Sequence, residues 1–279
     1  MIDDEIELRI LRYVDDGFED SDYMTAIVTA LPLPQIFDLI CGMLRSTDDE
    51  SSNMTGLFLR DTILMGHQNP GCVPFLDAYP DSSIVKTLEE LLFSNNYFTR
   101  IAVIYTLGKT CSYGSKDVLS QAFELFRETD PLLLDRLISE MGWLGVENLN
   151  SCIESMVTSS SYLTRWAAVG MICPIGDTDE GIVQWAKALR QDECELIRIE
   201  AEYEYQRVLK SLQTPILSKT EQRQRAKDIK KMKPLLSFQD VSIRFMNHLS
   251  NHGLNHYTVS ELESFVELCW KEYRPSPQS

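Results

Sequence analysis

The sequence has no long apolar run and no secretory leader. No stretch approaches the roughly 18 to 20 apolar residues that a membrane-spanning helix needs. The N-terminal text MIDDEIELRILRYVDDG is acidic where a leader would be basic and then apolar. Because 44 % of the 279 residues are hydrophobic, the chain can still bury a substantial core. We therefore expect a folded, soluble protein of the cytoplasm, without a membrane partner.

Paired cysteines are also missing. The seven cysteines are odd in number and never closer than about 20 residues, which favours neither a disulfide framework nor a CxxC metal site. We expect most of them to be small buried apolar residues in a reducing compartment. They are Cys41, Cys72, Cys111, Cys152, Cys173, Cys194 and Cys269.

The chain lacks the familiar catalytic signatures. It has no G-x-S-x-G, no phosphate-cradling glycine loop, no HExxH and no cysteine with an identifiable histidine partner. His248, His252 and His256 are four residues apart, a spacing that places imidazoles on one helical face as metal ligands require. Gly253 predicts that the helix stops at His252, and no cysteine or carboxylate motif accompanies the histidines. We therefore expect ordinary histidines near a helix C-terminus, no metal and no cofactor.

Charge is strongly one-sided. The formal net charge of −16 opposes a phosphate backbone, so a basic protein partner fits the chain better than nucleic acid does. Segment 219–233, KTEQRQRAKDIKKMK, has the opposite sign and is predicted to be a basic helix or loop that meets solvent or the chain's own acidic surface. The N-terminal acidic cluster is either a solvated end cap or a landing site for a basic partner. Its acids are Asp3, Asp4, Glu5, Glu7, Asp15, Asp16, Glu19, Asp20 and Asp22, against Arg9 and Arg12.

Part of the chain repeats itself. The phrases YFTRIAVIYTLGK at 97–109 and YLTRWAAVGMICPIG at 162–176 share a Tyr, a Thr-Arg pair, an Ala and an apolar run. Gly114, Gly145 and Gly176 are 31 residues apart, each between an apolar run and a polar segment. This spacing predicts a repeat architecture.

Each unit of the repeat is predicted to be a helix, a polar turn and a second helix. Asp130 and Pro131 mark one helix start, with Asp as N-cap and Pro at the first helical position. Arg100, Arg165 and Arg198 recur with the repeat, and we expect them to link adjacent units through Asp or backbone carbonyls. Because one helix pair cannot bury its own apolar face, neighbouring pairs are expected to stack and share a core.

Residues 84–208 resemble HEAT-like repeats of the short type first associated with bilin lyases. The phrases TDPLL with MGWLG, TRWAAV with PIGD, and WAKALRQDE match that family's Asp-Pro-like turn, Ala-rich first helix and second helix ending near Ala-Leu. The resemblance implies an all-α protein with a right-handed α-α superhelix, a HEAT/armadillo-like solenoid. It also implies that the second helices form a concave binding surface.

The predicted layout has four parts. Residues 1–45 would form N-terminal capping helices, 46–210 the HEAT-like repeats, 211–234 a basic linker or helix, and 235–279 two C-terminal helices. The second of these helices begins at the capping box TVSE, Thr258 to Glu261.

The candidate partner-contact residues are mostly small or polar, which disfavours a nucleic-acid groove of interleaved cations and aromatics. Trp143 and Trp166 stand where such repeats are often exposed, so each is either a binding hot spot or a cover for a neighbouring helix. The predicted second-helix contacts are Lys86, Glu90, Gln121, Glu124, Ser151, Ser155, Val183, Gln184 and Lys187.

Three functions remain open. The first is a non-enzymatic protein-interaction module, specialised as an acidic inhibitor or immunity protein that binds a basic partner such as a nuclease toxin. The second, implied by the resemblance, is a bilin-lyase-like enzyme or chaperone subunit. The third and least favoured is a HEAT-like DNA glycosylase, which would need a basic concave face and a catalytic carboxylate.

Overall fold

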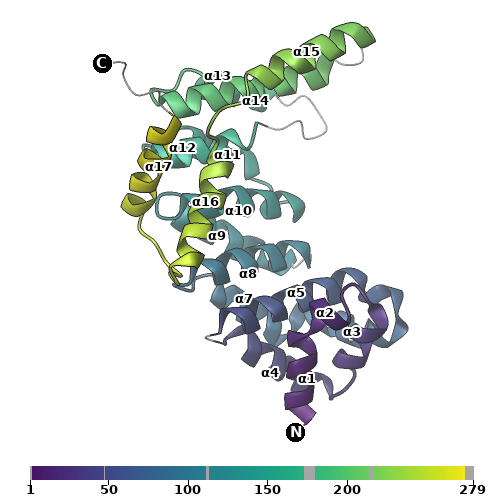
Figure 1. Ribbon diagram of the computed structural model, residues 1–279. Coiled ribbons are helices and arrows are strands. Elements are labelled where there is room, and N and C mark those ends of the chain that lie inside the picture. The colour runs from purple at the N-terminus through teal and green to yellow at the C-terminus, as the bar shows by residue number, and fades with distance from the viewer. Residues whose placement is uncertain (1, 47, 111–112, 173–179, 214–216, 274–279) are drawn as a thin grey trace. The chain divides into compact units, whose positions relative to one another are not determined.

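The computed structural model describes residues 2–46, 48–110, 113–172, 180–213 and 217–273, with backbone alone at 2, 49, 113, 180–183 and 211–213. Every regular element in these ranges is an α-helix or a 3-10 turn, so the predicted all-α class is confirmed (Figure 1). The chain divides into two compact units. Unit 1 is Met1–Ala122 with Ser139–Glu147, and unit 2 is Phe123–Ile138 with Asn148–Ser279.

Unit 1 contains the N-terminal helices, connected in part by short 3-10 turns. The turns are η1 (Gly66–Gln68), η2 (Pro70–Cys72), η3 (Tyr79–Asp81) and η4 (Tyr113–Ser115). Helices α9 (Lys116–Phe126) and α10 (Pro131–Trp143) contribute residues to both units. The remaining helices of unit 1 are α1 (Ile2–Leu11), α2 (Tyr13–Asp16), α3 (Ser21–Val28), α4 (Leu33–Leu44), α5 (Asp49–Met65), α6 (Val73–Ala78), α7 (Ser83–Leu91) and α8 (Tyr97–Lys109).

The core of unit 1 forms around α5, which packs against α1 and α8, while α4 packs against α7. Tyr13 is fully buried and meets Phe58 edge to face, with ring centroids 5.5 Å apart. Its hydroxyl donates to Asp61 Oδ2 at 3.0 Å, and Arg60 pairs with the same carboxylate. The buried phenol and carboxylate are therefore satisfied, as buried polar groups need to be.

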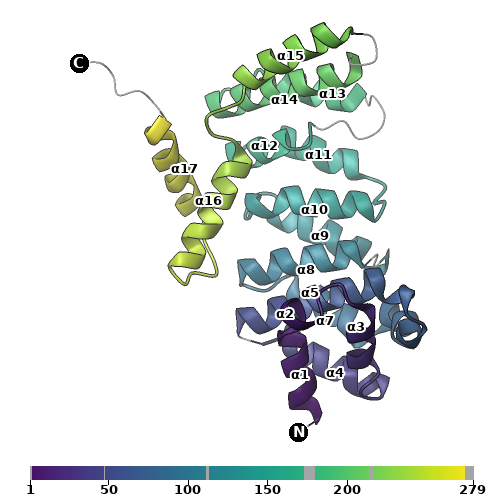
Figure 2. The same ribbon diagram turned by 45° about the vertical axis from the view of Figure 1, so that its right-hand side comes forward.

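Unit 2 contains the C-terminal half of the helices. Within it, α11 packs against α12, and α14 packs against α12, α13 and α15. Figure 2 shows α15 lying along α14. The helices are α11 (Leu149–Val157), α12 (Tyr162–Val169), α13 (Glu180–Leu189), α14 (Glu195–Gln213), α15 (Lys219–Lys231), α16 (Phe238–Asn251) and α17 (Val259–Tyr273).

Several predicted helix boundaries are confirmed. Helix α10 begins at Pro131, and the basic segment forms helix α15. The capping box before α17 is present, since the Thr258 N–H donates to Glu261 Oε2 at 2.7 Å and the Glu261 N–H to Thr258 Oγ1 at 3.3 Å. Helix α16 ends at Asn251, and Gly253 takes a φ of +63°, which favours glycine over other residues.

The predictions for the repeat glycines and the cysteines concern residues of which the structure describes only some. Gly145 follows α10 in the left-handed region, at a φ of +70°, whereas Gly176 lies outside the described residues. Of the cysteines, Cys111 and Cys173 also lie outside them, and the remainder are free, four of them buried and Cys194 partly so. The four-part layout stays a prediction.

Among the described helices, none is by itself long and apolar enough to cross a membrane. The bent pair α3 and α4 meets that criterion of length and composition only when its two members are taken together.

Candidate interaction surfaces

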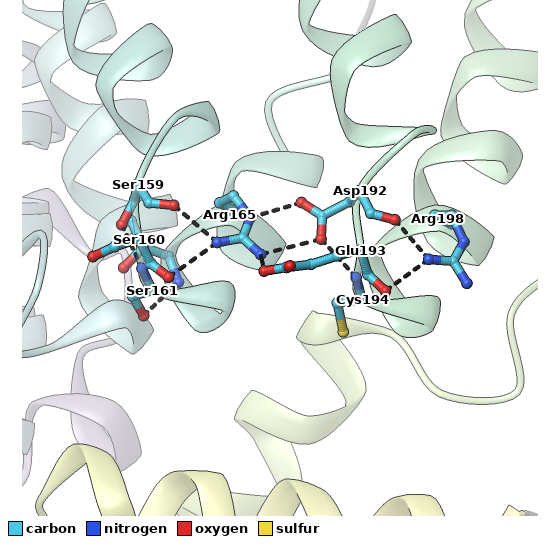
Figure 3. A network of polar contacts seen from close by, with 9 residues as sticks. Ser159, Ser160, Ser161, Arg165, Asp192, Glu193, Cys194 and Arg198 are labelled. Carbon is cyan, nitrogen blue, oxygen red and sulfur yellow. Dashed lines mark hydrogen bonds and ion pairs between the residues drawn. The ribbon is translucent and has the colours of Figure 1, made fainter.

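An arginine clamps the turn that precedes helix α12 and reaches the turn before α14 (Figure 3). Arg165 Nη1 donates to the carbonyls of Ser159 and Ser160 at 2.9 and 3.1 Å. Its Nε donates to Asp192 Oδ2 at 2.7 Å, in the following turn. Both charged side chains are largely buried, at 11 % and 6 % exposed, so this pair is shielded from water. The predicted linking role is confirmed for Arg165.

The same geometry recurs one turn later and in unit 1. Arg198 Nη1 donates to the carbonyls of Asp192 and Glu193 at 2.6 and 2.7 Å. In unit 1, Arg100 Nη1 donates to the carbonyl of Ser94 at 2.7 Å. In all three cases the arginine stands four residues after the helix N-cap and bonds a carbonyl six residues earlier. The repeat seen in the sequence is therefore also a repeat of hydrogen bonds.

Trp166 is not a surface residue. It is fully buried in α12, and its ring meets Phe238 of α16 with centroids 5.5 Å apart. The indole Nε1 donates to Glu200 Oε2 at 2.5 Å. The expectation of a surface aromatic is therefore wrong for Trp166, because the adjacent C-terminal segment supplies an apolar ring and α14 supplies an acceptor.

Glu200 is a buried carboxylate that joins three helices of unit 2. It is 7 % exposed, and its Oε2 accepts from both Trp166 Nε1 and the Phe238 N–H, the latter at 2.8 Å. Burial raises the pKa of Glu200 to about 7, although the two hydrogen bonds act in the opposite direction. This side chain is therefore poised to titrate near neutral pH.

In unit 1 the predicted contact residues reach solvent. Lys86 and Glu90 are exposed on α7, where Glu90 pairs with Arg45 at 2.8 Å, and Gln121 is exposed on α9. Trp143 is 62 % exposed at the end of α10, with Lys109 Nζ 4.6 Å from its ring centroid. These positions are accessible to a partner.

In unit 2 most predicted contacts are also accessible. Ser155 is half-buried and its hydroxyl donates to the carbonyl of Cys152 at 2.7 Å, so it is largely occupied within its own helix. The side chain of Val183 lies outside the described residues. The exposed members are Glu124 on α9, Ser151 on α11, and Gln184 and Lys187 on α13.

The histidines border a shallow apolar groove between α16 and α17, of about 450 Å³. The rings of His248 and His252 lie 4.3 Å apart, while His256 follows the helix as predicted. Among the described residues no group of three His, Cys, Asp or Glu side chains could hold a metal ion. The groove is lined by Phe245, His248, Leu254, His256, Phe265 and Leu268, with other residues of the same two helices.

The N-terminal helices expose an apolar stripe. Leu8, Leu11, Val14 and Phe18 are between 37 and 49 % exposed. Leu8 and Leu11 stand on α1, Val14 stands on α2, and Phe18 lies in the turn that follows α2. The exposed acids of the same segment stand beside them in the sequence, at Asp3, Asp4, Glu5, Asp15, Asp16 and Glu19. We name this apolar stripe with its acids the N-terminal acidic surface.

Helix α15 carries a basic stripe. Lys219, Arg223, Lys227, Lys230 and Lys231 are all exposed. At 100° per residue they fall within about 120° of the helix circumference. The two acids of the helix, Glu221 and Asp228, fall outside that sector, and Lys231 pairs with Asp228 at 3.7 Å. We name these five cations the α15 basic stripe.

Two features of the structure were not predicted from the sequence. The exposed apolar residues of the N-terminal segment stand among nine acids, and their spacing of three, three and four residues is the signal that sets them apart. Glu200 follows Ile197 by three residues and therefore stands on the apolar face of α14, which is a signal that could have revealed a buried carboxylate.

No family model matches the chain, and comparisons with curated proteins and with solved structures likewise give no match.

Proposed function

We propose that this chain is a non-enzymatic protein-interaction module, built as a HEAT-like α-solenoid, that binds a basic protein in the cytoplasm. The observation that carries this proposal is the N-terminal acidic surface, in which four exposed apolar side chains stand among acids. An inhibitor or immunity protein for a basic toxin is the specialisation that this charge favours.

The chemistry of the surface supports a protein partner. Protein interfaces concentrate affinity in a desolvated apolar centre, and a polar rim surrounds that centre. Leu8, Leu11, Val14 and Phe18 supply such a centre. The surrounding carboxylates would steer a cationic partner during encounter, an effect that salt weakens.

The recurring arginine clamp supports the solenoid part of the proposal. Solenoids stack similar units through similar neighbour contacts. Arg165 and Arg198 give two successive turns of unit 2 the same bonding pattern, and Arg100 repeats its carbonyl contact in unit 1.

The test is capture with the tagged full chain from an extract of its source cells, at about 50 mM and about 300 mM salt, where screening differs strongly. The wild type is compared with Leu8→Gln/Leu11→Gln, which keeps helix propensity and charge but removes two of the four side chains of the apolar centre. The matched control is Leu64→Gln/Leu125→Gln, which changes two exposed leucines elsewhere.

We expect one basic protein to be retained stoichiometrically by the wild type and the control. The N-terminal variant should retain at least tenfold less of it, corresponding to about 1.4 kcal/mol of lost binding free energy. If the wild type retains no basic protein, or if both variants retain it equally, the proposal is wrong.

A further inference from the structure

The α15 basic stripe has no counterpart in the remainder of the sequence. Segment 219–233 has seven Lys or Arg and two Asp or Glu, hence a net charge of +5 within a chain of net charge −16. The rest of the chain therefore carries −21. Helix α15 packs against α14 and buries Ile229, so its charged side chains gather on the exposed face. The excess of positive charge on that face favours an anionic occupant.

The stripe is available for contact. Its five cations are exposed, and within the described parts of the chain Lys219, Arg223, Lys227 and Lys230 form no ion pair. The stripe spans about 18 Å at the helical rise of 1.5 Å per residue. Met232 and Leu235 follow it, 39 % and 67 % exposed, and add apolar surface at its C-terminal end.

The N-terminal acidic surface matches the stripe in both respects. Residues 1–22 have nine Asp or Glu and two Arg, a net charge of −7. Like the stripe, this surface combines exposed charge with exposed apolar side chains, here Leu8, Leu11, Val14 and Phe18. Opposite charges around apolar contacts are the pattern that fixes register in a protein interface.

We propose that the α15 basic stripe docks on the N-terminal acidic surface of a second copy of this chain. Such a contact joins two different patches, so it is heterologous and extends head to tail into open chains or a closed ring. Self-association then covers the same acidic surface that a basic partner would use. A basic partner and a second copy therefore compete.

Other polyanions fit the stripe less well. Segment 217–236, LSKTEQRQRAKDIKKMKPLL, has no aromatic side chain on which a nucleobase could stack. The net charge of −21 on the rest of the chain repels a long phosphate backbone. A second copy is also net negative, but it carries −7 of its −16 charge in residues 1–22, which can face the stripe directly.

The experiment is sedimentation velocity of the full chain, before and after nuclease treatment, over a concentration series at about 30 mM and about 300 mM salt. At low salt the weight-average mass should rise with concentration past that of a dimer or to a fixed ring, and it should fall to the monomer at high salt. A monomer at every low-salt concentration overturns the proposal, as does association that disappears on nuclease treatment.

Charge reversal identifies the two patches. Arg223→Glu/Lys227→Glu/Lys230→Glu and, separately, Asp15→Lys/Asp16→Lys should each weaken association at least tenfold, and a mixture of the two variants should restore it. The control Arg45→Glu/Arg207→Glu/Lys271→Glu changes three exposed cations elsewhere, has the same net charge as the stripe variant and should associate like the wild type. Circular dichroism verifies that each variant folds.

The outcome is separable from that of the proposed function, because the stripe variant leaves the N-terminal acidic surface intact. If the stripe variant still captures a basic protein while the wild type never self-associates, only the present inference fails. If the mixture does not restore association, or if the control variant loses it, the two patches are not partners.

Discussion

Replacing Glu200 with glutamine should stabilise unit 2 at alkaline pH and remove part of its pH dependence. Burial raises the pKa of this carboxyl from 4.5 to about 7. A raised pKa means that the native state binds more protons than the unfolded state between these two values. The free energy of unfolding therefore falls as pH rises through this window.

The magnitude follows from the linkage relation. Ionising a carboxyl whose pKa is raised from 4.5 to about 7 costs the native state about 3 kcal/mol at pH 8. About 1 kcal/mol of that cost is already present at pH 5.5, so about 2 kcal/mol is lost between pH 5.5 and pH 8. The glutamine carbonyl keeps the acceptor for Trp166 and for the Phe238 N–H without acquiring a charge.

The assay is urea unfolding monitored by tryptophan fluorescence, which reports chiefly on unit 2, since Trp143 alone of the four tryptophans is in unit 1. A lower limit of pH 5.5 stays above the sequence pI of about 4.7, where the chain would precipitate. Glu154→Gln, an exposed substitution on α11, is the charge-matched control. If Glu200→Gln and the wild type lose stability equally over this range, the burial argument is refuted.

Three further substitutions test the other contacts. Arg165→Ala leaves the carboxylate of Asp192 buried without its cation, so the free energy of unfolding should fall by about 3 kcal/mol in the same urea assay. The control Arg207→Ala breaks a more exposed ion pair and should lower it by less than about 1 kcal/mol. Thr258→Ala removes a helix cap and should cost about 1 kcal/mol in the free energy of unfolding, with Thr258→Ser restoring most of it. Trp143→Ala should lower the melting temperature by no more than a few degrees, because the ring is largely exposed and its contact with Lys109 contributes about 1 kcal/mol or less; a larger drop would contradict a surface role.

The helix boundaries that depend only on neighbouring residues could be predicted from the sequence. Pro131, the Thr258 capping box and Gly253 each act within one turn of chain, and the structure confirms all three boundaries. The exposure of Trp166 could not be predicted from the residues around it, because its ring contacts Phe238, which lies 72 residues later in the sequence. The burial of Trp166 was thus decided by tertiary packing.

The C-terminal segment supplies partners for two buried carboxylates of unit 2. Four residues after its N-cap, α10 has Leu134, fully buried, where α12 and α14 have their clamping arginines. Asp130, 3 % exposed at that turn, instead accepts a hydrogen bond from the hydroxyl of Tyr257, between α16 and α17. Similarly, the Phe238 N–H at the start of α16 donates a hydrogen bond to the buried Glu200 of α14, a residue distant in the sequence. Because buried carboxylates need such partners, Tyr257 and Phe238 contribute to the packing of unit 2, the unit to which residues 235–273 belong.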